Sequence, residues 1–433
     1  MNWQIKEHKT IQEKVYMADL SPGPALYVLP RQGFNKKYAI ISTQFGSIDN
    51  CFYLKQNGKE RINVPDGVAH FLEHKLFDNE EGNVFDRFAE YGASPNAFTT
   101  FTHTTYLFSC TEYFSENLQL LLDFVQSPYF TEESVAKEQG IIQQEILMYQ
   151  DNPDWKVFFN LLGALYQEHP VRKDIAGNVE SISQITKDVL YSCYNTFYHP
   201  GNMAIFVTGD LSPELVLRQV EEDLQRRAVT DTNEIERCYP NENFSVKERK
   251  VAQELSISQP VINIGFKDAY TYLSGRELLL RDLVTELLLE MIFSKSEPLY
   301  TRLYEEGLID ERFNAGFVAE CSYGYTIMGG KTKDPNLLHQ RILEGIERIK
   351  KEGLRKESFE RHRRKMQGEF LKSFNALEFI ANNFLAYRFR GIDFFEIVDV
   401  LETVSFEDIE NRLHEHLTEG MHASSIIYPV NSL

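Results

Sequence analysis

The feature that most constrains the fold is an outline that occurs twice along the chain. In the first half a strand-like segment, AIISTQFGSIDNCFYL (39–54), precedes the apolar helix VAHFLEHKLF (68–77). In the second half the strand-like VINIGFK (261–267) precedes a longer apolar helix without histidine, RELLLRDLVTELLLEMIF (276–293). Self-similarity of this kind predicts two domains of one architecture, of which only the first carries chemically active residues.

The length of the chain agrees with a division into two domains. At 433 residues it exceeds what one hydrophobic core usually contains, so two domains of about 200 residues each are expected. Residues 226–245 are polar, aperiodic and contain a proline, which is typical of a linker. The sequence therefore predicts an N-terminal domain over residues 1–225 and a C-terminal domain over residues 246–433.

The net charge and the cysteine content exclude some classes of protein and indicate the cellular compartment. A net charge of −19 disfavours nucleic-acid binding, which needs clustered Lys and Arg. Five widely spaced cysteines without a CxxC pair argue against a disulfide framework and against a thiolate zinc site. The first ten residues lack a signal-peptide core, and no segment has the roughly 18 apolar residues of a membrane span. We therefore expect a cytoplasmic protein without a membrane span.

Two further segments bear on the chemistry. NAFTTFTHTTYLFSC (96–110) alternates with period two and is expected to form one long strand. Thr131, followed by two glutamates, is expected to cap a helix that continues to about Gln150.

The first apolar helix is interrupted by an HxxEH motif. At 100° per residue, His70, Glu73 and His74 fall within one arc of about 100°, opposite the apolar residues. Imidazoles at positions i and i+4 lie one above the other and can bind one metal ion. The alternative is a pair of hydrogen-bonded histidines in the core. A catalytic zinc usually takes three protein ligands, so a metal site requires one more.

The helix predicted over residues 132–150 offers a further ligand. Glu138 and Glu145 are seven residues apart and therefore share a face, which borders the apolar stripe. Glutamates in such a place are rarely buried unless they are paired or bind a metal. The alternative is that they lie at the solvated edge of the stripe. Taken together, the two helices indicate a metal site.

On these residues the chain resembles the pitrilysin or insulinase family of zinc peptidases, whose inverted motif is HxxEH. In that family a pair of glutamates seven residues apart follows the motif at the distance seen here. Further similar stretches are Asn96-Ala97 at the start of a Thr-rich strand, HPVRKDIAGNVESISQIT (169–186) and FYHPGNMAIFVTGD (197–210).

The resemblance implies roles for particular residues. One Zn²⁺ per chain would be held by His70, His74 and Glu145, with Glu73 as the general base and Glu138 as a second catalytic carboxylate that orients a ligand. Asn96 and Ala97 would bind an extended peptide along the edge of their strand; the alternative is an ordinary strand of the sheet.

The resemblance also implies a fold and an activity. The fold is α+β with two similar domains, each a mostly antiparallel sheet covered by helices, which together form half of a clam-like peptidase chamber. The activity is that of a zinc metalloendopeptidase subunit that cleaves unfolded peptides or small proteins.

One feature of the family is missing from this chain. Many active relatives carry a segment of the type LREExGLAY, whose Arg and Tyr reach the substrate carbonyl near the zinc. Here the corresponding run is LYEEGLID (303–310), with Tyr304 in place of the arginine. Charge and a phenol at the developing oxyanion would lower the barrier, so we expect a homo- or hetero-dimer in which a related subunit supplies them. The alternative is a non-catalytic scaffold or peptide-binding subunit with a structural zinc.

Overall fold

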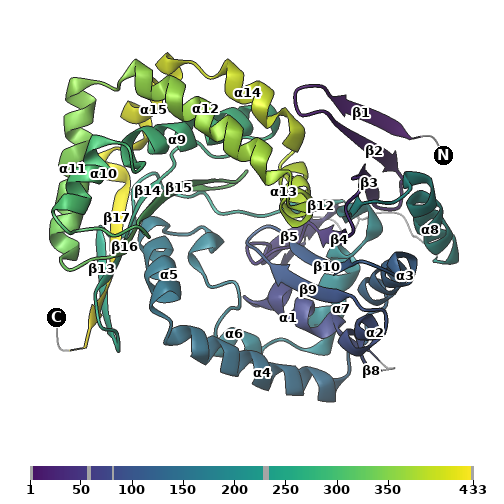
Figure 1. Ribbon diagram of the computed structural model, residues 1–433. Coiled ribbons are helices and arrows are strands. Elements are labelled where there is room, and N and C mark those ends of the chain that lie inside the picture. The colour runs from purple at the N-terminus through teal and green to yellow at the C-terminus, as the bar shows by residue number, and fades with distance from the viewer. Residues whose placement is uncertain (1–2, 56–59, 80–81, 228–233, 431–433) are drawn as a thin grey trace. The chain divides into compact units, whose positions relative to one another are not determined.

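A computed structural model describes residues 3–55, 60–79, 82–227 and 234–430 (Figure 1). The chain forms two compact units, each composed of several segments. Unit 1 comprises Met1–Ile146, Asp174–Cys238 and Ser373–Phe389, and unit 2 comprises Leu147–Lys173, Tyr239–Lys372 and Arg390–Leu433. No helix in the described part of the chain is long and apolar enough to cross a membrane.

Unit 1 is built on a seven-stranded sheet of order β1-β2-β3-β11-β4-β10-β9. Neighbouring strands are antiparallel except β3 and β11, which are parallel. Its strands are β1 (Gln4–His8), β2 (Glu13–Asp19), β3 (Ala25–Pro30), β4 (Lys37–Thr43), β9 (Ser94–Thr99), β10 (Thr104–Cys110) and β11 (Met203–Gly209). Every residue of the central strand β11 is buried, which explains its continuous apolar sequence.

Helices and two small sheets complete unit 1. The helices are α1 (Val68–Leu76), α2 (Val84–Glu90), α3 (Phe114–Val125), α4 (Glu132–Gln150, whose last turn belongs to unit 2), α6 (Val179–Ser183), α7 (Lys187–Phe197), α8 (Pro213–Arg226) and α13 (Leu377–Phe389). One small sheet has the order β12-β5-β6 and the other pairs β7 with β8, with strands β5 (Cys51–Leu54), β6 (Arg61–Asn63), β7 (Asp78–Asn79), β8 (Gly82–Asn83) and β12 (Ile235–Arg237).

Unit 2 contains a five-stranded sheet of order β13-β17-β14-β16-β15. Its strands are β13 (Lys250–Leu255), β14 (Val261–Lys267), β15 (Asn314–Ala319), β16 (Gly324–Lys331) and β17 (His422–Pro429). Its helices are α5 (Pro153–Leu165), α9 (Gly275–Phe293), α10 (Pro298–Glu305), α11 (Pro335–Glu352), α12 (Lys356–Ser373), α14 (Ile397–Thr403) and α15 (Phe406–His416). Helices α5 and α9 both contact this sheet (Figure 1). Short 3₁₀ helices occur in unit 2 at η2 (Pro170–Arg172), η4 (Phe394–Glu396) and η5 (Glu419–Met421), and in unit 1 at η3 (Pro200–Asn202).

The two sheets share one topology. The order β3-β11-β4-β10-β9 in unit 1 corresponds to β13-β17-β14-β16-β15 in unit 2, and the single parallel pair lies at the same place in both. Helix α1 follows β4 in sequence as α9 follows β14. The predicted α+β class, with two similar domains built on mostly antiparallel sheets, is therefore confirmed.

The composition of the units differs from the predicted continuous domains. Helix α5, predicted in the N-terminal domain, belongs to unit 2 because its Val157 packs against Val261 and Ile427 of that sheet. Helix α13, predicted in the C-terminal domain, belongs to unit 1, where the Phe384 ring lies 4.8 Å from the Tyr27 ring. Sequence periodicity shows that a helix has an apolar face but does not show which sheet covers it.

The predicted linker, residues 226–245, is corrected in part. Within it, residues 235–237 form β12, which pairs with β5, and the chain passes from unit 1 to unit 2 between Cys238 and Tyr239. Residues 228–233 of the predicted linker lie outside the described residues.

The segment 96–110 is a hairpin rather than one long strand. Strands β9 and β10 are joined by a turn in which the Thr100 hydroxyl accepts hydrogen bonds from the backbone N–H groups of Thr102 (3.2 Å) and His103 (3.0 Å). A threonine side chain can close such a turn without glycine, so the period-two pattern continues through it undisturbed. The turn makes β9 an edge strand of the sheet.

Candidate metal centre

Helix α1 presents the HxxEH motif on one face. It begins after Gly67, whose φ of 88° favours glycine, and a Cβ there would lie 2.4 Å from the carbonyl oxygen of Ala176. The other face is buried in unit 1 and consists of Val68, Ala69, Phe71, Leu72, Lys75 and Leu76. The three polar residues of the motif are half-buried. The local sequence therefore fixes both the start of the helix and the direction of its polar face.

Helix α4 begins and ends where the sequence predicts. The Thr131 hydroxyl accepts a hydrogen bond from the Ser134 N–H, and the Ser134 hydroxyl accepts one from the Thr131 N–H, each at 3.1 Å. This reciprocal capping satisfies two backbone groups at the start of the helix. The buried stripe of α4 consists of Val135, Glu138, Ile142 and Ile146. Glu138 is thus buried among apolar residues, and Glu145 is half-buried beside them.

The side chains of His70, His74 and Glu145 converge. One atom of a ligand type from each of the three lies within 4.8 Å of the others. His70 Nε2 is 3.8 Å from Glu145 Oε1, and His74 Nε2 is 3.5 Å from Glu145 Oε2. Ligand atoms about 2.0–2.1 Å from a tetrahedral zinc lie about 3.3 Å apart. Two nitrogens and one carboxylate at these separations fit a zinc ion.

The predicted carboxylates lie beside this group. Glu138 Oε1 is 3.0 Å from His74 Nδ1, a hydrogen bond that turns Nε2 of the same ring toward Glu145. Glu73 lies on the same helix face, and its Oε2 accepts a hydrogen bond of 2.6 Å from the Thr99 hydroxyl. Thr99 was not singled out from the sequence, although it follows Asn96-Ala97 on the strand that carries the predicted peptide-binding residues.

Burial and the charges of neighbouring side chains shift the pKa values of His70, Glu73 and His74. Burial, aided by the neighbouring His74, lowers the pKa of His70 to about 3, so this ring is the neutral imidazole that metal ligation requires. Burial lowers the pKa of His74, but the hydrogen bond with Glu138 and the charges of Glu73 and Glu145 outweigh it, so the net shift is upward. Burial raises the pKa of Glu73 against the opposing hydrogen bond from Thr99. A raised pKa brings this carboxylate closer to the range in which it can exchange protons at neutral pH.

The predicted peptide-binding residues lie on the edge strand β9. Asn96 pairs with Leu107 and Ala97 with Tyr106 on β10. The Thr100 N–H donates to the His103 carbonyl, and hydrogen-bonded positions alternate along an antiparallel ladder. The backbone groups of Asn96 therefore point toward β10, and those of Ala97 point away from it. Ala97 is oriented as an added peptide strand would require.

In unit 2, side chains of the run LYEEGLID (303–310) contact other residues of the same unit. Tyr304 is 49% exposed, and its ring stacks beside Tyr300. Arg302 Nε donates to Glu306 Oε1 at 2.8 Å, and Arg341 Nε donates to Glu306 Oε2 at 3.0 Å. Arg302, two positions before Tyr304, is therefore engaged in an ion pair with Glu306 of its own unit.

Comparison with known proteins agrees with this geometry. The model of the insulinase family, peptidase family M16, matches residues 62–179, and that of the "Peptidase M16 inactive domain" matches residues 184–366. The chain is 46% identical over 411 residues to the "Uncharacterized zinc protease YmfH" of Bacillus subtilis (strain 168), covering 95% of this chain and 96% of the relative.

Solved structures show the same fold. An M16-like peptidase from Alicyclobacillus acidocaldarius superposes with a TM-score of 0.92 at 36% identity, covering 99% of both chains. The periplasmic protease PqqL from Escherichia coli superposes with a TM-score of 0.76 at 15% identity, covering 96% of this chain and 47% of PqqL. The fold of this chain thus corresponds to about half of that longer one.

Proposed function

Because the chain belongs to the insulinase family of peptidases, M16, we propose that it is a zinc metalloendopeptidase subunit that hydrolyses peptide bonds in unfolded peptides or small proteins. The observation that carries the proposal is the convergence of His70, His74 and Glu145 next to Glu73. The relatives are named zinc proteases, which agrees with a nitrogen and carboxylate donor set.

Each residue of the proposed site has a distinct task. A zinc ion would supply a Lewis acid that polarises the scissile carbonyl and acidifies water. Glu73, kept in place by Thr99, accepts a proton from the attacking water and later delivers it to the leaving amine. Glu138 holds the Nδ1 side of His74 and so keeps Nε2 directed to the ligand position.

The proposed substrate is an extended peptide that adds to the edge of β9. The outward backbone groups of Ala97 would bond to the peptide main chain, and bonds to a main chain tolerate many side chains. Such a mode suits unfolded segments, because a folded substrate cannot offer an extended strand.

Glu73→Gln tests the catalytic role. We expect the variant to retain about one zinc per chain, measured by elemental analysis, and to lose cleavage of an unstructured fluorogenic peptide by about 100-fold or more. Glu133→Gln, on the exposed first turn of α4, removes the same charge and should leave cleavage unchanged. If Glu73→Gln cleaves like the wild type, the assignment of the base is wrong.

We further propose that full activity requires a second, related subunit that supplies an Arg and a Tyr. Two observations support this: Arg302 is engaged by Glu306, and PqqL contains the fold of this chain plus about as much again. Cleavage measured against protein concentration, and again after a related chain is added, tests it. A rate per chain that is independent of both would contradict the proposal.

The second candidate function is a non-catalytic scaffold or peptide-binding subunit with a structural zinc. It is favoured by the same missing Arg and Tyr at residues 303–310. The two functions are distinguished by the zinc-loaded protein with its partner, because a scaffold would bind peptide without cleaving it.

A further inference from the structure

Two cysteines outside the metal centre face each other across a pair of strands in unit 1. Cys51 is the first residue of β5, and Cys238 directly follows β12. The antiparallel register pairs Arg237 with Phe52, so the next pair along the ladder is Cys238 with Cys51. The Cys238 N–H donates to the Cys51 carbonyl at 2.9 Å, which shows that the pairing continues to these residues.

This register places the two residues at the spacing of a disulfide. Directly opposed residues of an antiparallel pair have Cα atoms about 4.5–5.5 Å apart and side chains on the same face. Disulfides join Cα atoms about 4.4–6.8 Å apart. A bond between the two sulfurs therefore needs side-chain rotation rather than movement of the strands.

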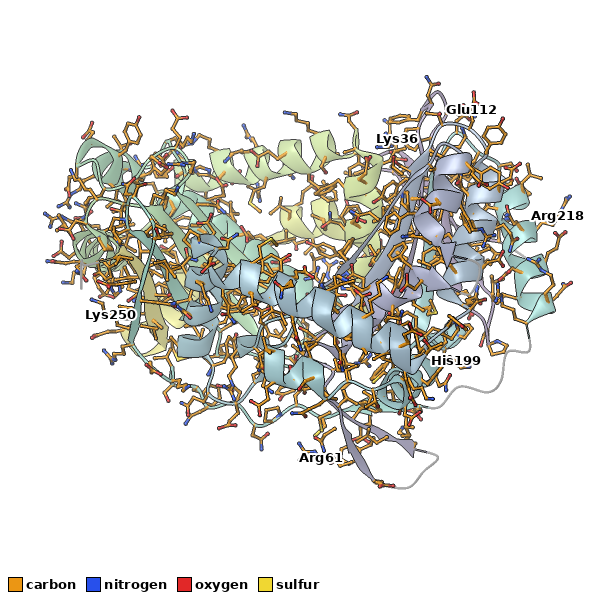
Figure 2. The ribbon with its side chains drawn as sticks, turned by 90° about the horizontal axis from the view of Figure 1, so that it is seen from below. Lys36, Arg61, Glu112, His199, Arg218 and Lys250 are labelled. Carbon is orange, nitrogen blue, oxygen red and sulfur yellow. The ribbon has the colours of Figure 1, made fainter. Side chains whose placement is uncertain are left out.

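The side chains of Tyr53 and Arg61 lie on the same face of the sheet as Cys51. Tyr53 shares the face with Cys51, two residues along β5, and pairs with Arg61 of β6. Arg61 Nε donates to Cys51 Sγ at 3.0 Å, and Figure 2 labels Arg61 on this strand pair. Cys238 is the neighbour that most raises the pKa of the Tyr53 phenol, so its sulfur lies beside that side chain.

The two thiols differ in access. Cys51 is 5% exposed, whereas Cys238 is half-buried and open to a small oxidant. Burial raises the pKa of Cys51, the Cys238 thiol raises it further, and Arg61 opposes both. The guanidinium thus lies where negative charge develops on Cys51 Sγ when its proton is lost.

We propose that Cys51 and Cys238 form an oxidation site that a hydroperoxide converts to a disulfide. The Cys238 thiolate attacks one oxygen of hydrogen peroxide, the O–O bond breaks, and the hydroxide that leaves is protonated to water, which gives a sulfenic acid at Cys238. Cys51 Sγ then attacks the Cys238 sulfur, so that the S–S bond forms and the S–O bond breaks. The second hydroxide takes the Cys51 proton. Two thiols are oxidised by two electrons, and one peroxide is reduced to two waters.

The position of the pair gives the disulfide a structural consequence. Cys238 is the last residue of the second segment of unit 1, and Tyr239 is the first residue of the following segment of unit 2. The bond would tie the segment that leaves unit 1 to β5 and would close a long loop of the unfolded chain. Closing a long loop stabilises the folded state, with an expected rise in Tm of about 5–10 °C.

The test uses the full-length protein treated with a small excess of hydrogen peroxide, alkylated and digested without reductant. We expect a pair of peptides linked through Cys51 and Cys238, two hydrogens lighter than the separate peptides and released by dithiothreitol. Cys110, Cys193 and Cys321 serve as internal references and should be recovered in alkylated form.

Two variants sharpen the experiment. Cys321→Ser should retain the linked peptide and the rise in Tm, whereas Cys238→Ser should lose both. Alkylation of both Cys51 and Cys238 after peroxide treatment, or a bond from either one to another cysteine, would overturn the proposal. The peptide map of the wild-type protein decides this even if Cys238→Ser does not fold.

Discussion

At the level of single residues, the orientation of Glu73 depends on one hydroxyl of a neighbouring strand. The Thr99 hydroxyl donates to Glu73 Oε2 at 2.6 Å, and Thr99 ends β9 opposite Thr104. Thr104 is itself fixed, because its hydroxyl donates to the Phe45 carbonyl at 2.8 Å. A chain of contacts thus links the proposed base to the backbone of the sheet.

We predict that Thr99→Val lowers kcat about tenfold and leaves the zinc content unchanged. Valine keeps the shape of threonine but removes a hydrogen bond to a charged group, which contributes about 1.5–3 kcal/mol. Thr99→Ser, which keeps the hydroxyl, should recover most of the rate. The measurement is peptide cleavage with parallel zinc analysis, and equal kcat for the valine and serine variants would contradict the prediction.

Glu138 is predicted to act on the metal through His74. Glu138→Ala removes the partner of His74 Nδ1 and should weaken zinc binding about 10–100-fold, as loss of such outer carboxylates typically does. Competition with a zinc chelator measures the affinity without reference to activity. Glu133→Ala on the same helix is the matched control, and a Glu138→Ala affinity equal to that of the control would show that Glu138 has no such role.

At the level of elements, the corresponding edge strands β9 of unit 1 and β15 of unit 2 differ in the contacts of their backbone groups. The ladder pair Thr99–Thr104 in unit 1 corresponds to Ala319–Gly324 in unit 2, so Ala97 corresponds to Phe317. The Phe317 N–H donates to Glu286 at 2.5 Å, and the Ala319 carbonyl accepts from Arg390 at 2.7 Å. Side chains thus bind two of the outward backbone groups of β15, which protects this edge strand.

The burial of Glu286 makes the stability of the protein depend on pH. Burial raises the pKa of Glu286 to about 8, and the charges of Asp282 and Glu290 contribute, against the Phe317 N–H. The folded state therefore favours the neutral acid, whose stabilisation is complete below pH 4.5 and is lost as the pH rises toward 8.

We predict that Glu286→Gln, which keeps an acceptor oxygen, becomes more stable relative to the wild type between pH 5 and pH 8. The difference in unfolding free energy should grow by at most about 1.4 kcal/mol per pH unit. Denaturant unfolding at several pH values measures it. Glu320, whose pKa burial raises to about 7, is present in both proteins and cancels in the difference. A constant difference across this range would refute the prediction.

The start of α1 depends on Gly67, and this too can be tested. Gly67→Ala combines a left-handed φ of 88° with a Cβ only 2.4 Å from the Ala176 carbonyl oxygen, so we expect a loss of about 2 kcal/mol or more in unfolding free energy. Gly140→Ala in α4 meets no atom within 4 Å and should instead stabilise by about 0.5–1 kcal/mol. If the two variants are equally stable, the role assigned to Gly67 is wrong.

At the level of the whole molecule, the two units share one topology but carry different side chains at corresponding places. The HxxEH motif occurs on α1, and the corresponding helix α9 places a carboxyl, Glu286, against its own edge strand. In the run LYEEGLID (303–310), Tyr304 stands where the resemblance to the family leads us to expect an arginine. We propose that the chain carries the metal-binding half of a peptidase site and that a related subunit supplies the other half. The cytoplasmic location expected from the cysteines and the N-terminus stays a prediction.

Features that depend on short spacing along the chain could be predicted from the amino-acid sequence. A helix of 3.6 residues per turn places His70, Glu73 and His74 on one face, and the same rule places Glu138 with Glu145. Those local rules do not depend on the rest of the chain, which is why they could be predicted.

The contacts between separate segments were established by the folded structure of the chain. It ended β9 at Thr99 beside Glu73, assigned α5 and α13 to their sheets, and brought Cys51 opposite Cys238. Contacts between residues far apart in sequence depend on which apolar faces pack together and which strands pair. The spacing of residues along the chain does not determine these contacts. Many different pairs of segments could come together, and closing the loop between them would cost a similar amount of conformational entropy in each case.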